Sequence, residues 1–150
     1  MMQEFYAIDG YPIDLQTSEK LFLEFISDEN LGKAWIITSE ENGKTQIAGY
    51  AILTFIFSFE YGGKIAFIDE LYIKESFRGK GIGKASIEFL KTEAAKLSLK
   101  LLYLEVEEHN LNAQKLYIAA GFEMHNRKIM KYKVDRNNTK WNSQIKPLRN

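Results

Sequence analysis

The segment that most constrains the fold is the run 77–84, Phe-Arg-Gly-Lys-Gly-Ile-Gly-Lys, which stands between a strand-type and a helix-type sequence. Glycine lacks a Cβ atom, so its three glycines allow unusual backbone dihedrals and a close approach of a ligand. Amides in the first turn of a helix carry the positive end of the helix dipole and bind anions. The run therefore predicts a phosphate-binding loop at the start of a helix.

Two common phosphate-binding motifs do not fit this run. A Walker loop requires glycine where Arg78 stands and serine or threonine where Ala85 stands. A dinucleotide-binding fingerprint requires a third glycine at position 84 or 86, where the chain has Lys84 and Ser86. A phosphate ligand of this loop would therefore be of another kind, and a glycine-rich turn that only starts a helix stays open.

Hydrophobic periodicity places the loop in an α+β domain. We expect strands at residues 3–8, 33–39, 45–58, 64–73, 101–106, 122–124 and 129–134, and helices at 17–29, 81–97 and 110–120. Thr17 or Ser18 is the expected N-cap of the first helix, and Asn42-Gly43 predicts a hairpin between the second and third strands. The strand, helix and strand over 64–106 predict a parallel pair with a right-handed crossover, hence a mixed sheet.

Length and composition favour one ordinary globular domain, which we place at residues 1–135, followed by a polar, basic tail at 136–150. With no cysteine, the chain has no disulfide, no thiolate metal ligand and no cysteine nucleophile. We see no targeting segment and no apolar run of membrane-spanning length, and we expect a soluble, cytoplasmic protein with no metal.

The charges are unevenly distributed although they sum to zero. Residues 1–75 contain 13 acidic and 5 basic residues (net −8), and residues 76–150 contain 7 acidic and 15 basic residues (net +8). A basic half suits an anionic cofactor or a nucleic acid, and an acidic half suits a cationic acceptor. The basic residues form no RNA-binding signature, so we expect no nucleic-acid partner.

Two motifs resemble those of the GNAT superfamily of N-acetyltransferases. Asp69-Glu70-Leu71-Tyr72-Ile73, followed by Arg78-x-x-Gly81-x-Gly83, resembles the acyl-CoA pyrophosphate motif of that family. Asn110-x-x-Ala113-x-x-Leu116-Tyr117, ending in Gly121-Phe122, resembles its second motif. The resemblance covers roughly residues 33–134. It implies a GNAT-like sheet, mixed and mostly antiparallel, with helices on both faces and a splayed parallel strand pair.

The resemblance also implies roles for individual residues. Acetyl-CoA, the acetyl donor, would lie between the splayed strands, with its pyrophosphate on the glycine loop. The residues expected to bind it are Leu71, Tyr72, Ile73, Arg78, Gly79, Lys80, Gly81, Gly83, Lys84 and Asn110. An amide near Leu71 would stabilise the oxyanion, and Tyr117 would direct its hydroxyl at the sulfur. From spacing alone, Tyr117 is a core aromatic residue and Asn110 a helix N-cap.

Acetyl transfer to an amine requires a proton acceptor. An alkyl ammonium has a pKa of about 10.4, so the nucleophilic free base is scarce at neutral pH. Asp69, Glu70, Glu105 and Glu107 are the candidate acceptors, acting directly or through a water, and we favour Glu70. A tyrosine, with a pKa near 10, remains protonated and can stabilise the departing thiolate. Direct attack in a ternary complex needs no acetyl-enzyme.

The acceptor is the least determined part of the prediction. The acidic residues expected around its cleft favour a small cationic amine such as a polyamine; they are Glu60, Asp69, Glu70, Glu105, Glu107 and Glu108. The turn Tyr61-Gly62-Gly63-Lys64 is also similar to the diamine and polyamine acetyltransferase branch. Protein amino groups, aminoglycosides and amino acids stay open, as does a nonenzymatic CoA-binding module.

The N-terminal region departs from the family pattern. Family members carry two helices between the first two strands, where this sequence predicts one, so we expect a more open acceptor cleft. Dimers are common in the family, and a C-terminal strand could pair between subunits, but the sequence leaves a homodimer open.

Overall fold

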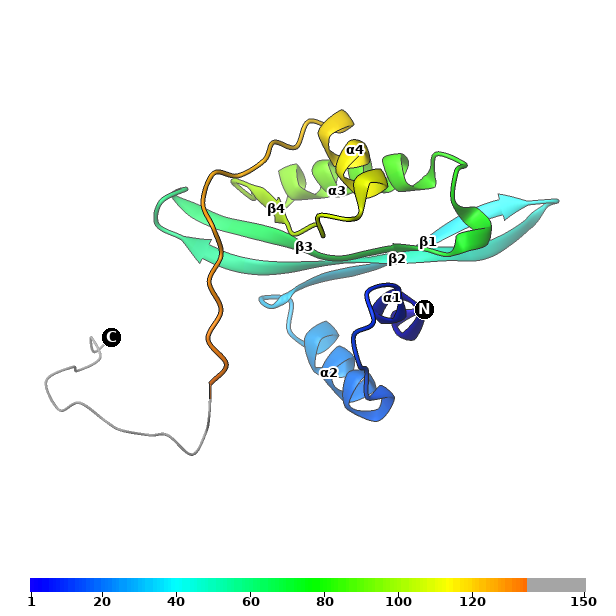
Figure 1. Ribbon diagram of the computed structural model, residues 1–150, viewed down its shortest axis with the longest axis horizontal. Helices are drawn as coiled ribbons and strands as arrows, with labels where there is room; N and C mark the ends of the chain where they lie inside the picture. The colour runs from blue at the N-terminus through cyan, green and yellow to red at the C-terminus, as the bar shows by residue number, and fades with distance from the viewer. Residues whose placement is uncertain (135–150) are drawn as a thin grey trace, which may run out of the picture.

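The computed structural model describes residues 1–134, which form a four-stranded sheet between two layers of helices. Helices α3 and α4 lie on one face of the sheet, and α1 and α2 lie on the other (Figure 1). In chain order the elements are α1 (Met2–Ile8), α2 (Leu15–Ser27), β1 (Gly32–Glu41), β2 (Lys44–Ser58), β3 (Gly63–Ile73), η1 (Glu75–Phe77), α3 (Ile82–Lys96), β4 (Leu102–Leu104) and α4 (Leu111–Ala119). The predicted α+β class is confirmed.

The sheet has the strand order β1-β2-β3-β4, with the first three strands antiparallel and β4 parallel to β3. Asn42 and Gly43 join β1 to β2 with φ angles of 53° and 70°, as the predicted two-residue hairpin requires. This mixed, mostly antiparallel sheet with helices on both faces is the one the sequence predicted.

Strands β3 and β4 pair over three residues only and then diverge. Ala66–Ile68 pair with Leu102–Leu104, whereas β3 continues to Ile73 alongside β2 alone. We call this opening between the end of β3 and the segment after β4 the splay. The predicted splayed pair is therefore present, although β4 is shorter than the expected strand at 101–106.

A bulge in β3 determines which side chains face each layer. Leu53 of β2 pairs with Ile68 and its neighbour Ile52 pairs with Glu70, so Asp69 is an extra residue without a partner on β2. Ile68 belongs to the core under α3, whereas Tyr72 belongs to the core under α1 and α2. The bulge therefore turns Glu70 and Tyr72 toward the α1 layer.

Each face of the sheet has its own core. On the α3 face Ala51, Leu53, Ala66, Ile68 and Leu90 form a buried cluster. On the other face the cluster consists of Tyr50, Ile52 and Tyr72, with Met1, Met2, Phe5, Phe22, Phe25 and Ala34 packed against it. The sheet thus separates two apolar layers, and Glu70 is one of only two buried polar or charged residues in the described chain.

The first predicted strand, 3–8, is wrong, because these residues form helix α1. In α1, Met2 and Phe5 are three residues apart and therefore lie on the same face of the helix. Both side chains pack against the sheet. Two helices therefore precede β1, not the single one expected. Helix α2 begins two residues earlier than predicted because Asp14, rather than Thr17 or Ser18, caps it by accepting the Thr17 N–H at 2.6 Å.

The two last predicted strands are also wrong, since residues 122–134 form no helix or strand. No strand within the described chain pairs with the outer edge of β4, and strand-forming residues need a partner to make a ladder. The predicted tail at 136–150 lies outside the described residues, so the domain division stays a prediction. No helix within residues 1–134 is both long and apolar enough to cross a bilayer.

Candidate active site

The glycine loop leads from β3 into the N-terminus of α3. Gly79 and Gly81 have φ angles of 74° and 79°, a left-handed conformation that favours glycine. Gly81 is the N-cap of α3 and offers no side chain to its first-turn amides. A Cβ atom at either glycine would meet no atom within 4 Å, so the loop is open to an anion.

Gly83 has a different role from its two neighbours. It lies inside the first turn of α3, and a Cβ atom there would stand 3.3 Å from Cδ2 of Leu116 on α4. That distance is tighter than an ordinary contact between apolar carbons. Gly83 thus permits the close packing of α3 on α4, which holds the two motifs together.

The cations of the loop are partly engaged within the protein. Arg78 Nε donates to the Ile73 carbonyl at 2.9 Å and so ties the loop to the end of β3. Lys80 Nζ lies 2.5 Å from Glu41 Oε1 at the β1–β2 hairpin. Lys84 is exposed and forms no salt bridge among the residues the structure describes, so it is available to a phosphate.

Backbone hydrogen bonds indicate where the amides of β3 point. The Ala66 N–H donates to the Leu101 carbonyl at 3.0 Å, toward β4, whereas the Lys74 N–H donates to a β2 carbonyl at 2.8 Å. Residues an even number apart on a regular strand point the same way, so the bulge accounts for this reversal. Beyond the bulge, the N–H groups of Leu71 and Ile73 therefore face the splay.

The predicted motif residues on α4 lie on the same face of the sheet as α3 (Figure 1). Asn110 caps α4 by accepting the Ala113 N–H at 3.1 Å, so its predicted capping role is confirmed. Tyr117 packs edge-on against Phe122, and its hydroxyl makes no hydrogen bond within residues 1–134. Burial raises the pKa of Tyr117, which keeps the phenol protonated.

Glu70 lies on the opposite side of the sheet from Tyr117. Its side chain is 5% exposed, and its two carboxylate oxygens accept hydrogen bonds from Tyr50 Oη at 2.5 Å and Tyr6 Oη at 3.1 Å. Burial raises the pKa of Glu70, and the two hydroxyl donors oppose that rise. Its neighbour Asp69 is exposed at the bulge, and partial desolvation raises its pKa.

Two long-range contacts lie where the segment after β4 meets the α1 layer. Tyr11 Oη donates to Glu107 Oε1 at 3.0 Å, and His109 Nε2 lies 3.1 Å from Asp9 Oδ1. They join the connection between α1 and α2 to the segment after β4. Glu60 does not belong to this acidic group, because it lies in the β2–β3 turn and pairs with Arg127.

Sequence reasoning missed the contributions of α1 and of the connection that follows it. Tyr6, Asp9 and Tyr11 lie 64 to 100 residues from their partners, so no local spacing links them. A helical reading of the first eight residues, with Met2, Phe5 and Tyr6 on one face, was the only available signal.

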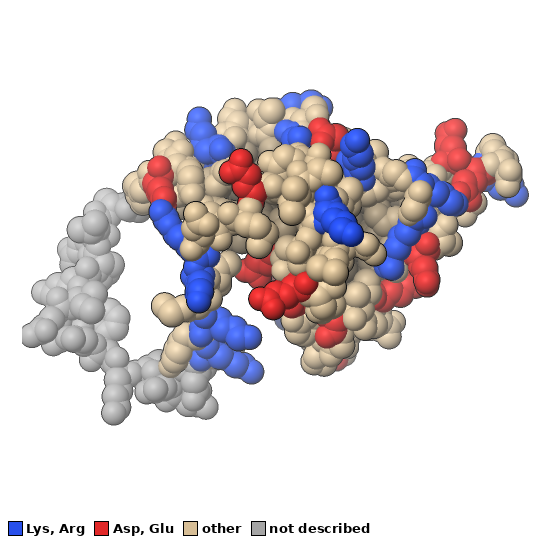
Figure 2. All heavy atoms as spheres, turned by 45° about the horizontal axis from the view of Figure 1, so that its top comes forward, with Lys and Arg blue, Asp and Glu red and all other residues tan. Residues whose placement is uncertain are grey.

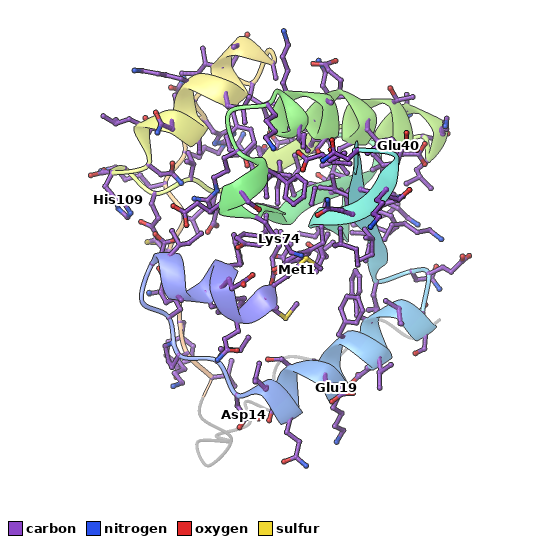
Figure 3. The ribbon with its side chains drawn as sticks, turned by 90° about the vertical axis from the view of Figure 1, so that its right-hand side faces the viewer. Met1, Asp14, Glu19, Glu40, Lys74 and His109 are labelled. Carbon is purple, nitrogen blue, oxygen red and sulfur yellow. The ribbon has the colours of Figure 1, made fainter. Side chains whose placement is uncertain are left out.

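Two cavities lie beside these elements. One of about 940 Å³ follows β4, α3, α4 and residues 122–129 and includes Tyr117. The other, of about 590 Å³, is lined mostly by apolar side chains between α1, α2 and β1, and Figure 3 shows Met1 and Glu19 on opposite sides of it. On the face in Figure 2, basic and acidic side chains are interspersed over most of the surface, and several basic side chains gather at its lower left.

The mixed sheet, the splay and the glycine loop are the features that the resemblance to GNAT acetyltransferases implied, and comparison with known proteins agrees. Residues 1–122 match the model of the Acetyltransferase (GNAT) family. The chain therefore belongs to the GNAT acetyltransferase family.

Individual relatives share only part of their length with the chain. It is 37% identical over 57 residues to the spermine/spermidine N(1)-acetyltransferase of Bacillus subtilis, a match that covers 37% of this chain and 38% of that protein. The chain spans about a third of the length of the first relatives it matches.

Solved structures share the fold over most of the chain. An integron cassette protein from the mobile metagenome of Cole Harbour Salt Marsh superposes with a TM-score of 0.76 and 29% identity, covering 89% of this chain and 80% of its own. The aminoglycoside N-acetyltransferase AAC(6')-Iy, solved in complex with CoA, superposes with a TM-score of 0.61 and 19% identity, covering 81% and 89%. The second likeness concerns the fold alone.

Proposed function

We propose that this protein transfers an acetyl group from acetyl-CoA to a primary amine by direct attack in a ternary complex. The observation that carries the proposal is the splay, with a phosphate loop at its end, free strand amides along it and a buried carboxyl group below it. These are the three groups that thioester binding, oxyanion stabilisation and amine deprotonation require.

The donor side of the site consists of the glycine loop and the end of β3. First-turn amides of α3 and the Lys84 ammonium group bind the pyrophosphate, and Arg78 holds the loop against Ile73. The strand amide of Leu71 faces the thioester carbonyl and donates to its oxygen as negative charge develops. Acetyl-CoA, when bound, supplies the acetyl group as a reactive thioester.

The proposed catalytic residues flank the splay from its two sides. Glu70 receives the proton that the amine must lose, and its raised pKa favours that uptake. Tyr117 stabilises the thiolate that leaves, because burial keeps its hydroxyl protonated at neutral pH. Asn110 contributes to pantetheine binding through the amide nitrogen that its cap does not use.

The acceptor in this proposal is a small cationic amine such as a polyamine. Asp9, Asp69 and Glu107 gather on the α1 side of the splay and attract ammonium groups. The similarity to a spermine/spermidine acetyltransferase supports the same choice. A cytoplasmic location, the absence of a metal and a homodimer stay predictions.

A panel of amines tests the proposal. Wild-type protein would be incubated with acetyl-CoA and spermidine, spermine, a diamine, an aminoglycoside, an amino acid and a peptide, and free thiol would be measured. We expect thiol release with the polyamines, well above the rate without an amine. Binding of acetyl-CoA without turnover on any amine would instead identify a nonenzymatic CoA-binding module.

A further inference from the structure

The proton acceptor Glu70 is closed off from solvent by two tyrosines. Its side chain is 5% exposed, and each carboxylate oxygen accepts one tyrosine hydroxyl, Tyr50 on Oε2 and Tyr6 on Oε1. An amine in the acceptor site therefore cannot reach the carboxylate directly while these bonds are made. The proton must pass through a group that touches both.

The two tyrosines differ in their access to the acceptor site. Tyr50 lies on β2 and is 6% exposed, with Phe5 and Tyr72 packed around its ring. Tyr6 is half-buried and lies on α1, just before the connection whose Tyr11 bonds Glu107 in the segment after β4. Of the two hydroxyl donors to Glu70, Tyr6 is therefore the one on a partly exposed side chain, and the amine of the proposed reaction would approach from that side.

We propose that Tyr6 is a catalytic residue that relays the proton from the substrate ammonium group to Glu70. This inference rests on the proposed amine acetylation. The N–H bond of the ammonium breaks as its proton binds Tyr6 Oη, while the hydroxyl proton of Tyr6 moves to Glu70 Oε1. Ammonium and carboxylate become neutral amine and carboxylic acid, and Glu70 returns the proton to solvent after product release.

The surroundings of Tyr6 suit a relay in which this tyrosine gains one proton as it loses another and so ends the step unchanged. Burial and the Glu70 carboxylate raise the pKa of Tyr6 to about 12, so the hydroxyl carries its proton at neutral pH. The other titratable groups facing the pair are Tyr50, Asp69 and Tyr72, the last bonded to Glu4. Two cations face Tyr72 and its partner, since Arg78 lies 5.9 Å from the Tyr72 ring and the Met1 ammonium lies 3.6 Å from Glu4. Neither forms a salt bridge or hydrogen bond with Glu70 within the described chain, so neither occupies the carboxylate.

Asp69 is the rival proton acceptor because it is exposed beside Tyr6. Its charge contributes to the raised pKa of Tyr6, so the two groups are near each other. In the relay, Asp69 attracts the ammonium and does not take its proton. A direct role for Asp69 would make Tyr6 dispensable, which the experiment below detects.

The variants Tyr6→Phe and Tyr50→Phe separate a relay from structural support. Each removes one hydroxyl donor from Glu70, so each raises the pKa of Glu70 in a similar way. Only Tyr6→Phe removes the route for the proton. With the best amine of the panel, we expect Tyr6→Phe to lose about 100-fold in kcat at neutral pH, the usual contribution of a positioned base. Tyr50→Phe should lose only a few-fold.

The pH profile and the donor KM complete the test. Activity of Tyr6→Phe should recover as pH rises toward the amine pKa, because free base then forms in solution without the enzyme. Its KM for acetyl-CoA and its melting temperature should match those of Tyr50→Phe. Equal losses in the two variants, or near wild-type activity of Tyr6→Phe, would overturn the relay alone. No wild-type turnover of any amine would overturn both the function and the relay.

Discussion

The α3 face and the α1 face of the sheet divide the site into a donor side and an acceptor side, and the chain builds them differently. The donor side consists of local features, with two left-handed glycines, a helix start and a capped second helix. The acceptor side depends on contacts between residues 64 to 100 positions apart. In the proposed function, local sequence features therefore build the donor side, and tertiary packing builds the acceptor side.

The two sides also differ in how their charged groups are held. On the donor side Lys84 is exposed and open to a ligand, as suits a phosphate that arrives with its own charge. On the acceptor side Glu70 is buried under two tyrosines. A solvated cation can bind an anion at once, whereas a buried carboxyl group is suited to exchanging a proton.

The largest expected effect comes from removing the proton acceptor. Glu70→Gln keeps the size of the side chain, but the amide cannot take a proton at neutral pH and offers one acceptor oxygen and one NH₂ donor in place of two acceptor oxygens. We expect kcat to fall about 10²- to 10⁴-fold, with the KM for acetyl-CoA unchanged, measured by thiol release.

The neighbouring variant Asp69→Asn is the matched control. It also removes one carboxylate from β3, but from the exposed bulge, and should act mainly on the KM for the amine. A larger loss of kcat in Asp69→Asn than in Glu70→Gln would move the proton acceptor to the bulge.

Two glycines allow a direct comparison of the sides. Gly81 in the donor loop and Gly10 between α1 and α2 have φ angles of 79° and 69°, and a Cβ atom at either meets nothing within 4 Å. Valine strains both backbones by about 1–2 kcal/mol. Gly81→Val should raise the KM for acetyl-CoA about tenfold, the value of one charge-assisted hydrogen bond.

Gly10→Val should leave the KM for acetyl-CoA unchanged and raise the KM for the amine, because it displaces the connection that carries Asp9 and Tyr11. Steady-state kinetics with each substrate varied would show whether Gly81→Val changes the KM for acetyl-CoA and Gly10→Val the KM for the amine. The reverse pattern would mean that the loop has been assigned to the wrong substrate.

Most of the fold could be predicted because its signals are local. The Asn42-Gly43 turn, the periodicity of α3 and the Asn110 cap each determine one element within a few residues. The errors lie at the two ends. Residues 3–8 alternate weakly and form a helix because the sheet offers an apolar face to Met2 and Phe5. Residues 122–134 contain strand formers without a neighbouring strand.

Prediction of the site has the same limit. Glu70 and Tyr117 could be selected as candidates from their motifs. The burial of Glu70 and its hydrogen bonds from Tyr6 and Tyr50 could not be predicted, because they depend on how α1 packs against the sheet. Likewise, the bulge at Asp69 that turns the Leu71 amide toward the splay depends on the register with β2. The sequence indicates which groups are candidates for the reaction, and the packing determines which way their side chains and amides point.

The buried carboxyl group of Glu70 should also affect how the free energy of unfolding depends on pH. Because burial raises the pKa of Glu70 in the folded state, the folded chain keeps this proton to a higher pH than the unfolded chain. Its contribution to the free energy of unfolding therefore falls as pH rises from the ordinary glutamate range through the raised pKa. Urea unfolding over this window should show a flatter pH dependence for Glu70→Gln. An unchanged slope would mean that Glu70 titrates normally.

The smallest expected effect comes from the exposed bond between Tyr11 and Glu107. Tyr11→Phe removes a hydroxyl that joins the connection between α1 and α2 to the segment after β4, while the Asp9–His109 contact stays in place. The KM for the amine should rise about twofold, as for other exposed polar pairs, with kcat and the KM for acetyl-CoA unchanged. Tyr61→Phe is the control, because it removes a hydroxyl bond to Tyr103 at the other end of β3. If both variants changed the amine KM equally, the connection between α1 and α2 would be no special part of the acceptor site, and acceptor choice would depend on charge alone.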